Sequence, residues 1–278
     1  MRAAAIDFGG TLTDVVVGEG PALRVERTAV ASRVARPDHA AIEHLLAAAG
    51  ATLGELDLLA VTGGRSHELP TQVAGVRLVH VGETEASARG ALDGLGLRPA
   101  VVVSLGTGTG VVLVPASGAP VRLIGSGIGG GTLLGLAQAL LGTTDVAEIG
   151  RLAAQGEIQR CDLTVGDIIG RGIGPVPAEA TAAHFARLAR PEGADARRED
   201  LAAALVNLVA QAIVRLGLEA MLVHQARMLV LIGHVLDVPG FREAFARIPL
   251  LGPDQLHVPA TPGLAVARGA LALALETV

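Results

Sequence analysis

A glycine-rich loop that leads directly into an apolar helix limits most strongly what this chain can fold into. Residues 125–136 read Gly-Ser-Gly-Ile-Gly-Gly-Gly-Thr-Leu-Leu-Gly-Leu. Glycine has no Cβ, so the backbone can approach a ligand closely, and the start of the following helix offers unpaired N–H groups and a positive dipole end. The pattern is therefore typical of a loop that binds a phosphate group.

Two further glycine turns lie at the ends of apolar runs. Asp7-Phe8-Gly9-Gly10-Thr11 follows the first run, and residues 104–110, Ser-Leu-Gly-Thr-Gly-Thr-Gly, separate two valine-rich runs. Turns of this kind can line up backbone N–H groups around anionic oxygens. Three phosphate-sized loops in one chain make a nucleotide-using enzyme the leading hypothesis.

The composition argues against several other classes of protein. A formal net charge of −5 without a basic cluster argues against a nucleic-acid partner. The single cysteine, Cys161, excludes a disulfide framework and is expected to be a small buried hydrophobe. No signal-peptide pattern precedes the first strand, and the apolar stretch Leu201–Val214 is too short to span a bilayer. We therefore expect a soluble, cytoplasmic protein with no membrane partner.

The order of the expected elements indicates a duplicated α/β fold. Ala3–Asp7 and Val15–Val17 are predicted strands on either side of the first glycine turn, and Ala100–Ser104 and Gly110–Val114 repeat this arrangement. Two halves that open in the same way suggest a nucleotide bound between them. The long apolar helix predicted at Leu201–Leu222 is either core or a dimer interface, because buried helices look the same in sequence.

These motifs together resemble those of the type II, or Fumble-type, pantothenate kinases of the actin-like ATPase superfamily. Residues 6–12 and 103–110 are similar to the first and second phosphate loops of that family. Residues 122–132 match its Arg-x-x-Gly-x-Gly-x-Gly-Gly-Gly-x spacing. Residues 156–185 resemble its lid segment, and residues 232–234 resemble its late strand and turn near the adenosine.

The resemblance implies a fold and an activity. The fold would be two RNase H-like domains around a nucleotide cleft: residues 1–96 with the first phosphate loop and a catalytic glutamate, and residues 97–278 with the second phosphate loop, the adenosine loop and the lid. The protein would be a homodimer that uses ATP and Mg²⁺ to phosphorylate the small molecule pantothenate, in the first step of coenzyme A synthesis.

The three loops and the late turn supply the residues expected to bind ATP. They are Asp7, Gly9, Gly10, Thr11, Gly106, Thr107, Gly108, Thr109, Gly127, Gly129, Gly130, Gly131, Thr132 and Gly233. Asp7 is also the expected metal ligand, since Mg²⁺ keeps several waters and takes one or two carboxylates. An aspartate there could instead cap the turn, but the neighbouring glycines and Thr11 favour the metal.

Glu83 is the expected general base. It follows a predicted strand and precedes a helix, where open α/β sheets place their ligand residues. Glu68 and Glu85 compete for this role. The family's base lies seven residues before a helix glycine, and counting back from Gly90 leads to Glu83.

Arg122 is the second expected catalytic residue, because it matches the substrate-side arginine of the family. The chain contains no lysine, so any cationic side chain that contacts phosphate through a permanent charge has to be arginine. In this interpretation the planar guanidinium binds a carboxylate or the transferred phosphoryl group with two hydrogen bonds.

Asp14 departs from the family, which usually has lysine at this place in the first loop. The resulting Gly-Gly-Thr-Leu-Thr-Asp is similar to the ATP-using hydantoinase and oxoprolinase enzymes of the same superfamily. Asp14 either binds metal or is a solvated hairpin residue. Two alternatives therefore stay open: an actin-like kinase or ATPase with another acceptor, and a catalytically silent dimer that binds a nucleotide or coenzyme A.

Overall fold

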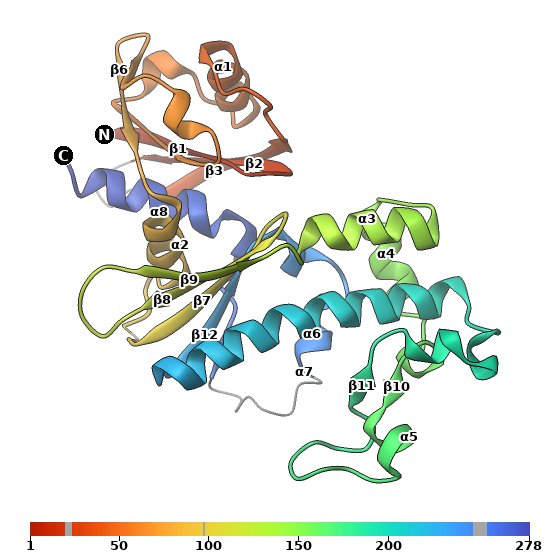
Figure 1. The fold of residues 1–278 in the computed structure, drawn as a ribbon. Coiled ribbons are helices and arrows are strands. Elements are labelled where there is room, and N and C mark those ends of the chain that lie inside the picture. The colour runs from red at the N-terminus through yellow and green to blue at the C-terminus, as the bar shows by residue number, and fades with distance from the viewer. Residues whose placement is uncertain (20–23, 97, 247–254) are drawn as a thin grey trace.

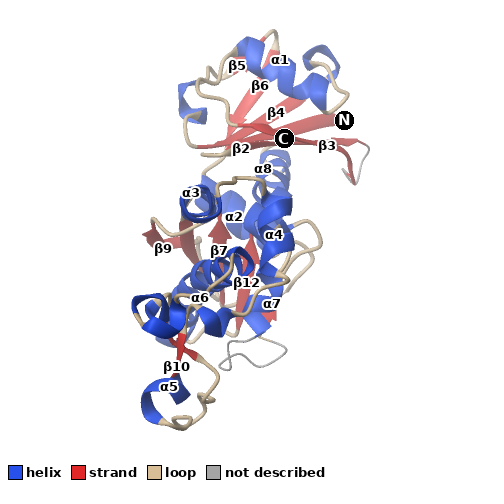
Figure 2. Ribbon diagram, turned by 90° about the vertical axis from the view of Figure 1, so that its right-hand side faces the viewer, coloured by secondary structure: helices blue, strands red, loops and turns tan. Residues whose placement is uncertain are grey.

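Two open β-sheets with a pair of helices between them form the body of the protein (Figure 1). The fold is that of a computed structural model, which describes residues 1–19, 24–96, 98–246 and 255–278. Each sheet also carries helices on its outer face (Figures 1 and 2). This arrangement confirms the predicted α/β class and the predicted duplication.

The first sheet has the strand order β3-β2-β1-β4-β6-β5. Its strands are β1 (Arg2–Phe8), β2 (Leu12–Glu19), β3 (Arg24–Ser32), β4 (Leu58–Gly63), β5 (Gln72–Val73) and β6 (Val76–His80). Strands β1, β2 and β3 are antiparallel, whereas β1, β4 and β6 are parallel. Alternate residues of β1 enter different cores, with Ala4 and Ile6 in one and Ala3 and Ala5 in the other. Because both faces of the sheet are covered, β1 and β4 read as continuous apolar runs.

The second sheet repeats this plan in the order β13-β12-β7-β8-β9. Its strands are β7 (Ala100–Leu105), β8 (Thr109–Val114), β9 (Val121–Ser126), β12 (Met228–Ile232) and β13 (Leu256–His257). Again the first three strands are antiparallel, and the later strands add in parallel. The glycine turn between β7 and β8 is therefore the counterpart of the turn between β1 and β2.

Helices fill the space between the sheets and cover their outer faces. The α-helices are α1 (His39–Ala48), α2 (Glu83–Ala91), α3 (Gly130–Leu141), α4 (Val146–Ala153), α5 (Val165–Ile169), α6 (Arg198–His224), α7 (Phe241–Ala246) and α8 (Ala265–Leu275). Short 3₁₀ turns are Leu53–Glu55, Ser66–Glu68, Ile158–Arg160, Ala186–Ala189, Pro191–Gly193, His234–Asp237 and Pro262–Leu264. Helix α1 packs on the outer face of the first sheet, and α3, α4 and α6 pack on that of the second.

Helices α2 and α8 lie side by side between the two sheets (Figures 1 and 2). Helix α8 comes from the end of the chain yet packs on β1 and β4 of the first sheet, and α2 reaches β7, β8 and β12 of the second. One buried core contains residues of both sheets and both helices. The two halves are thus joined through this helix pair, and the predicted boundary between residues 96 and 97 stays a prediction.

Helix α6 is the long apolar helix that the sequence predicts, and it belongs to the core. Most of its residues are buried against the second sheet, α3 and α4. It runs over 27 residues, so the prediction of a stretch too short to span a bilayer is wrong as regards length. Among the described residues it is the one helix long and apolar enough to cross a membrane, but 72% of its most apolar part is buried inside the protein. Such burial is typical of a core helix.

A small lobe formed by β10 (Leu163–Thr164), α5 and β11 (Thr181–Ala183) projects from the side of the second sheet remote from the first (Figures 1 and 2). Its anchor is the fully buried carboxylate of Asp162, which accepts hydrogen bonds from the backbone N–H of Phe185 and the side-chain amide of Asn207. His184 and Thr181 also contact this carboxylate. The lobe contains most of the segment that resembles a lid.

Candidate active site

A cavity of about 740 Å³ lies between the two sheets, where the glycine turns of both halves meet. Residues from the first sheet, α2, the second sheet and the start of α3 line it. Most of the predicted ATP-binding residues are among them, namely Asp7, Gly9, Gly10, Thr11, Gly106, Thr107, Gly108, Thr109, Gly127, Gly130 and Gly233. Segments far apart in the sequence therefore form one cleft. Residues 156–185 do not line it.

The first and second phosphate loops touch each other across this cleft. The hydroxyl oxygens of Thr11 and Thr107 are 2.7 Å apart, within hydrogen-bonding distance. A Cβ on Gly10 would come within 2.6 Å of the same Thr107 oxygen. The glycine in the first loop therefore permits the close approach of the two loops.

Three of the predicted nucleotide-binding residues are not among the residues that line the cleft. Gly129 packs on the second phosphate loop, where an added Cβ would lie 2.7 Å from the backbone of Gly108. Thr132 donates a hydrogen bond of 2.8 Å to the carbonyl of Gly127. Gly131 packs in the same way against Thr107. In the structure these residues hold the loops together, and their contact with a nucleotide stays a prediction.

Asp7 and Asp14 occupy opposite positions on the neighbouring strands β1 and β2. The pKa of Asp7 is raised to about 7, chiefly by burial and also by the nearby charges of Asp14 and Glu83, against a lowering effect of His234. Thr62 is the neighbour of Asp7 on β4, and its buried hydroxyl has no hydrogen-bond partner among the described residues. Asp7 thus lies in a crowded and strongly acidic part of the cleft.

The donor groups of the cleft fit a magnesium ion near Asp7. The described residues that line the cleft include four carboxylates, those of Asp7, Asp14, Glu83 and Asp237, but only Arg122 and His234 as cationic side chains. An ATP polyphosphate would be repelled by this surface without a divalent cation between them. Asp7 supplies the carboxylate that Mg²⁺ needs while it keeps most of its water ligands.

Glu83 is the first residue of α2 and lines the cleft, close enough to Asp7 to affect its pKa. Glu85 and Glu68 are not among the lining residues. The Glu68 carboxylate is bound by Arg65, with 2.5 Å between Oε1 and Nε. Arg122 lines the cleft from β9 of the second sheet. Of the three candidate bases, Glu83 is therefore the one that lines the cleft, and Arg122 lines the same cleft. The catalytic roles of both residues stay predictions.

The expectation that Asp14 is a solvated hairpin residue is wrong. Asp14 is 5% exposed, and its Oδ1 lies 2.8 Å from Nε2 of His234 on the second half of the molecule. Sequence reasoning missed this partner, because residues 220 positions apart carry no local signal of contact. His234 follows the late strand that the resemblance places near the adenosine. This position was the one indication in the sequence that His234 lies at the cleft.

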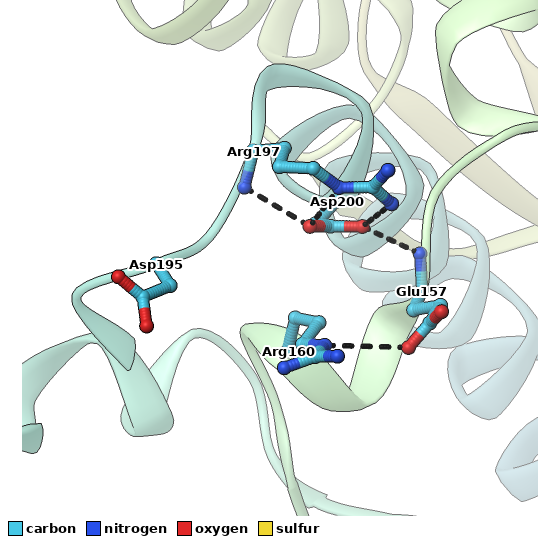
Figure 3. Close-up of a pocket in the computed structure, with 5 residues that line it drawn as sticks. All are labelled: Glu157, Arg160, Asp195, Arg197 and Asp200. Atoms are coloured by element: carbon cyan, nitrogen blue, oxygen red, sulfur yellow. Dashed lines mark hydrogen bonds and ion pairs between the residues drawn. The ribbon is translucent and has the colours of Figure 1, made fainter. Parts of the chain in front are cut away.

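A second hollow lies at the start of α6 and is lined by Glu157, Arg160, Asp195, Arg197 and Asp200 (Figure 3). Asp200 is one of the lining residues, is buried, and accepts hydrogen bonds from the Arg197 side chain and from the backbone N–H of Glu157. These bonds hold the pKa of Asp200 at about 2. The carboxylate joins the start of α6 to Arg197 and to the distant segment around Glu157, and we assign this hollow a structural role.

The raised pKa of Asp7 leads to a prediction for Asp7→Asn in metal-free buffer. The folded protein binds a proton here up to about pH 7, whereas the unfolded chain releases it near pH 3.8, so wild-type stability should fall between these pH values. The variant lacks this loss, so at pH 8 its free energy of unfolding should exceed that of the wild type by on the order of 2 to 4 kcal/mol.

Urea unfolding of both proteins from pH 5 to pH 8.5 in EDTA measures this difference. Asp93→Asn, which removes an exposed carboxylate paired with Arg89 at 3.3 Å, is the matched control. A difference between wild type and Asp7→Asn that does not change with pH would contradict the assigned environment of Asp7.

Comparison with known proteins shows relatives that are named as pantothenate kinases. Over 112 residues the chain is 41% identical to pantothenate kinase 1 of Oryza sativa subsp. japonica, a match that covers 39% of this chain and 17% of the rice protein. Over 225 residues it is 28% identical to a type II pantothenate kinase of Bacillus cereus, with 78% of each chain covered. The bacterial match extends through both halves of the fold.

Solved structures with the same fold include nucleotide-bound proteins. The activator of 2-hydroxyisocaproyl-CoA dehydratase from Clostridium difficile, solved with ADPNP, has a TM-score of 0.70 at 18% identity and covers 100% of this chain and 95% of its own. A ROK family glucokinase from Streptomyces griseus, in complex with glucose and AMPPNP, has a TM-score of 0.62 at 16% identity. The match covers 99% of this chain and 100% of the glucokinase chain. At these identities the similarity establishes the fold alone.

The sequence model of the Fumble family matches residues 79–239, more than half of the chain. The matched region contains Glu83, the second phosphate loop, Arg122 and the glycine-rich loop before α3. The expected family and the actin-like fold are therefore confirmed, and this chain belongs to the Fumble family.

Proposed function

We propose that this protein is a kinase that transfers the terminal phosphoryl group of ATP to pantothenate, giving 4'-phosphopantothenate for coenzyme A synthesis. The observation that carries the proposal is the single cleft in which both phosphate loops, Asp7, Glu83 and Arg122 converge from the two halves of the fold. The names of the relatives in rice and Bacillus cereus supply the acceptor.

The proposed mechanism is an in-line phosphoryl transfer that depends mostly on positioning. The two phosphate loops bind the phosphates through backbone N–H groups, with the hydroxyls of Thr11 and Thr107 beside them. Glu83 accepts the proton of the acceptor hydroxyl, and Arg122 binds negative charge on the far side. Mg²⁺ near Asp7 would neutralise the phosphate charge when bound. Closure of the two halves would exclude water and suppress hydrolysis of ATP.

The domain boundary near residue 96 and the assembly are part of the same proposal. Helices α2 and α8 would act as the joint between domains 1–96 and 97–278. A cytoplasmic homodimer is proposed from the family resemblance, and the exposed side chains of Ile168, Ile169 and Ile173 on the projecting lobe support a contact surface there. Light scattering on the purified protein measures the assembly directly.

One observation favours a second candidate, an actin-like kinase or ATPase with a different acceptor. Asp14 at the first loop is buried and paired with His234, so the cleft has a carboxylate where a cation was expected. The other alternative, a catalytically silent dimer that binds a nucleotide or coenzyme A, is not favoured, because such a protein has no physical need for Glu83, Arg122 and Asp7 in one cleft.

The experiment that tests the proposal is ADP release by the purified protein with ATP and Mg²⁺, with and without pantothenate. We expect release that depends on pantothenate. Release that is independent of pantothenate would favour the ATPase or another acceptor. Binding of ATP without any release, also after a screen of small alcohols, would favour the silent binding protein.

A further inference from the structure

The side chains of Asp14 and His234 form a direct contact across the cleft. Asp14 belongs to β2 of the first sheet, and His234 begins the 3₁₀ turn after β12 of the second sheet. Their Oδ1 and Nε2 atoms are 2.8 Å apart, and Asp14 is almost completely buried. The other ring nitrogen of His234, Nδ1, lies 3.2 Å from Oδ2 of Asp237 in the same turn.

Each end of this contact is attached to a different phosphate loop. Asp14 lies near the start of β2, just after the first loop, and opposite Asp7 near the end of β1. The turn that carries His234 is packed tightly on the second loop, because a Cβ on Gly233 would lie 2.2 Å from the carbonyl oxygen of Leu105. The imidazole ring is also pressed against Gly263, where a Cβ would lie 2.3 Å from it. Both ends of the contact are therefore close to a phosphate loop.

The charges explain why the contact should be strong. Both ring nitrogens of His234 face carboxylates, so a protonated imidazolium can donate to Asp14 and to Asp237 at once. Its pKa is raised chiefly by the hydrogen bond with Asp14. Without His234, the buried Asp14 would face Asp7 without its hydrogen-bonded partner, and an unpaired buried charge is strongly unfavourable.

We propose that Asp14 and His234 are positioning residues that bridge the two halves of the fold and set the separation of the two phosphate loops for nucleotide binding. The contact between Thr11 and Thr107, at 2.7 Å, gives the same loops a second point of attachment. The consequence for turnover rests on the kinase function proposed above, whereas the bridge itself concerns the binding of the nucleotide.

The test uses a double-mutant cycle with His234→Gln, Asp14→Asn and the double variant, in the full-length protein. The first measurement is the Kd of AMPPNP with Mg²⁺ by calorimetry, without any acceptor. We expect each single substitution to weaken binding about tenfold, and the double variant to be no weaker than the worse single one. Asp93→Asn, which removes an exposed carboxylate that does not line the cleft, should weaken binding less than threefold.

A reversed pair, Asp14→His with His234→Asp, provides the rescue. We expect it to bind AMPPNP more tightly than either single variant, because the same two groups can meet across the cleft. In turnover assays the single variants should raise the KM for ATP about tenfold while the KM for the acceptor changes less than twofold. A purely structural loss would not separate these two constants.

Additive effects of the two single substitutions, or unchanged AMPPNP binding in both, would overturn the bridge. Because binding is measured without acceptor, the result holds if pantothenate is not the substrate. If the wild type binds no nucleotide, the kinase proposal fails instead. In that case the urea unfolding midpoints of the wild type, the two single variants and the double variant test the bridge. The bridge requires that the midpoint shifts of the two single substitutions are not additive, and additive shifts would reject it.

Discussion

Replacing Glu83 by glutamine is expected to lower turnover by about 10² to 10⁴-fold while ATP binding stays within about twofold of wild type. Glutamine has nearly the same shape as glutamate but cannot accept the proton of an acceptor hydroxyl. Glu83 is the first residue of α2 and lines the cleft near Asp7. Pantothenate-dependent ADP release measures turnover, and calorimetry with AMPPNP measures binding.

Two matched controls test whether the position or merely the charge matters. Glu85→Gln removes a carboxylate from the same helix that does not line the cleft, and Glu68→Gln removes the partner of Arg65. Both should retain turnover within about threefold of wild type. Near-normal turnover of Glu83→Gln, or a loss confined to Glu68→Gln, would show that another residue is the base.

Replacing Gly269 by alanine is expected to destabilise the protein by about 3 kcal/mol, although alanine is normally the better helix residue. Gly269 lies on α8 where it crosses α2, and an added Cβ would lie 2.0 Å from the carbonyl oxygen of Ala86. It would also lie 2.6 Å from the backbone nitrogen of Gly90. These are backbone atoms of a helix, so relief requires that the two helices separate.

Gly135→Ala on α3 is the control for this effect. Apart from its own stretch of helix, no heavy atom lies within 4 Å of the position that its Cβ would occupy, so helix propensity alone should raise stability by about 0.5 to 1 kcal/mol. Urea unfolding measures both variants. Equal or greater stability of Gly269→Ala would mean that the crossing of α2 and α8 is looser than in the structure. Because α2 carries Glu83 at its start, we also expect Gly269→Ala to lose activity.

Much of the candidate site could be predicted because its determinants are local in the sequence. Glycine turns at strand ends need backbone shapes and close approaches that few other residues allow. Apolar runs bounded by these turns indicate buried strands, and the same order of strand, turn and strand occurs twice. From these patterns and the family resemblance, the sequence pointed to the two sheets, the two phosphate loops and Glu83.

Other features could not be predicted because they depend on contacts between distant segments. The sequence shows Asn207 and Gln211 only as polar residues in an apolar helix. In the structure Asn207 donates to the buried Asp162 carboxylate, and Gln211 donates to the Asn207 side chain. The glycines 129 and 131 likewise fit a nucleotide loop, but in the structure they do not line the cleft and pack against the second phosphate loop.

The sequence by itself determined the glycine loops, the paired halves of the fold and the acidic groups at the strand ends, because each depends on residue type and short spacing. Only the tertiary structure decided which of these groups meet. In the structure Glu83 lines the cleft and Glu68 does not, α8 packs against the first sheet, and Asp14 contacts His234. The physical reason is that burial and pairing of charges depend on segments brought together by packing, which no local pattern records.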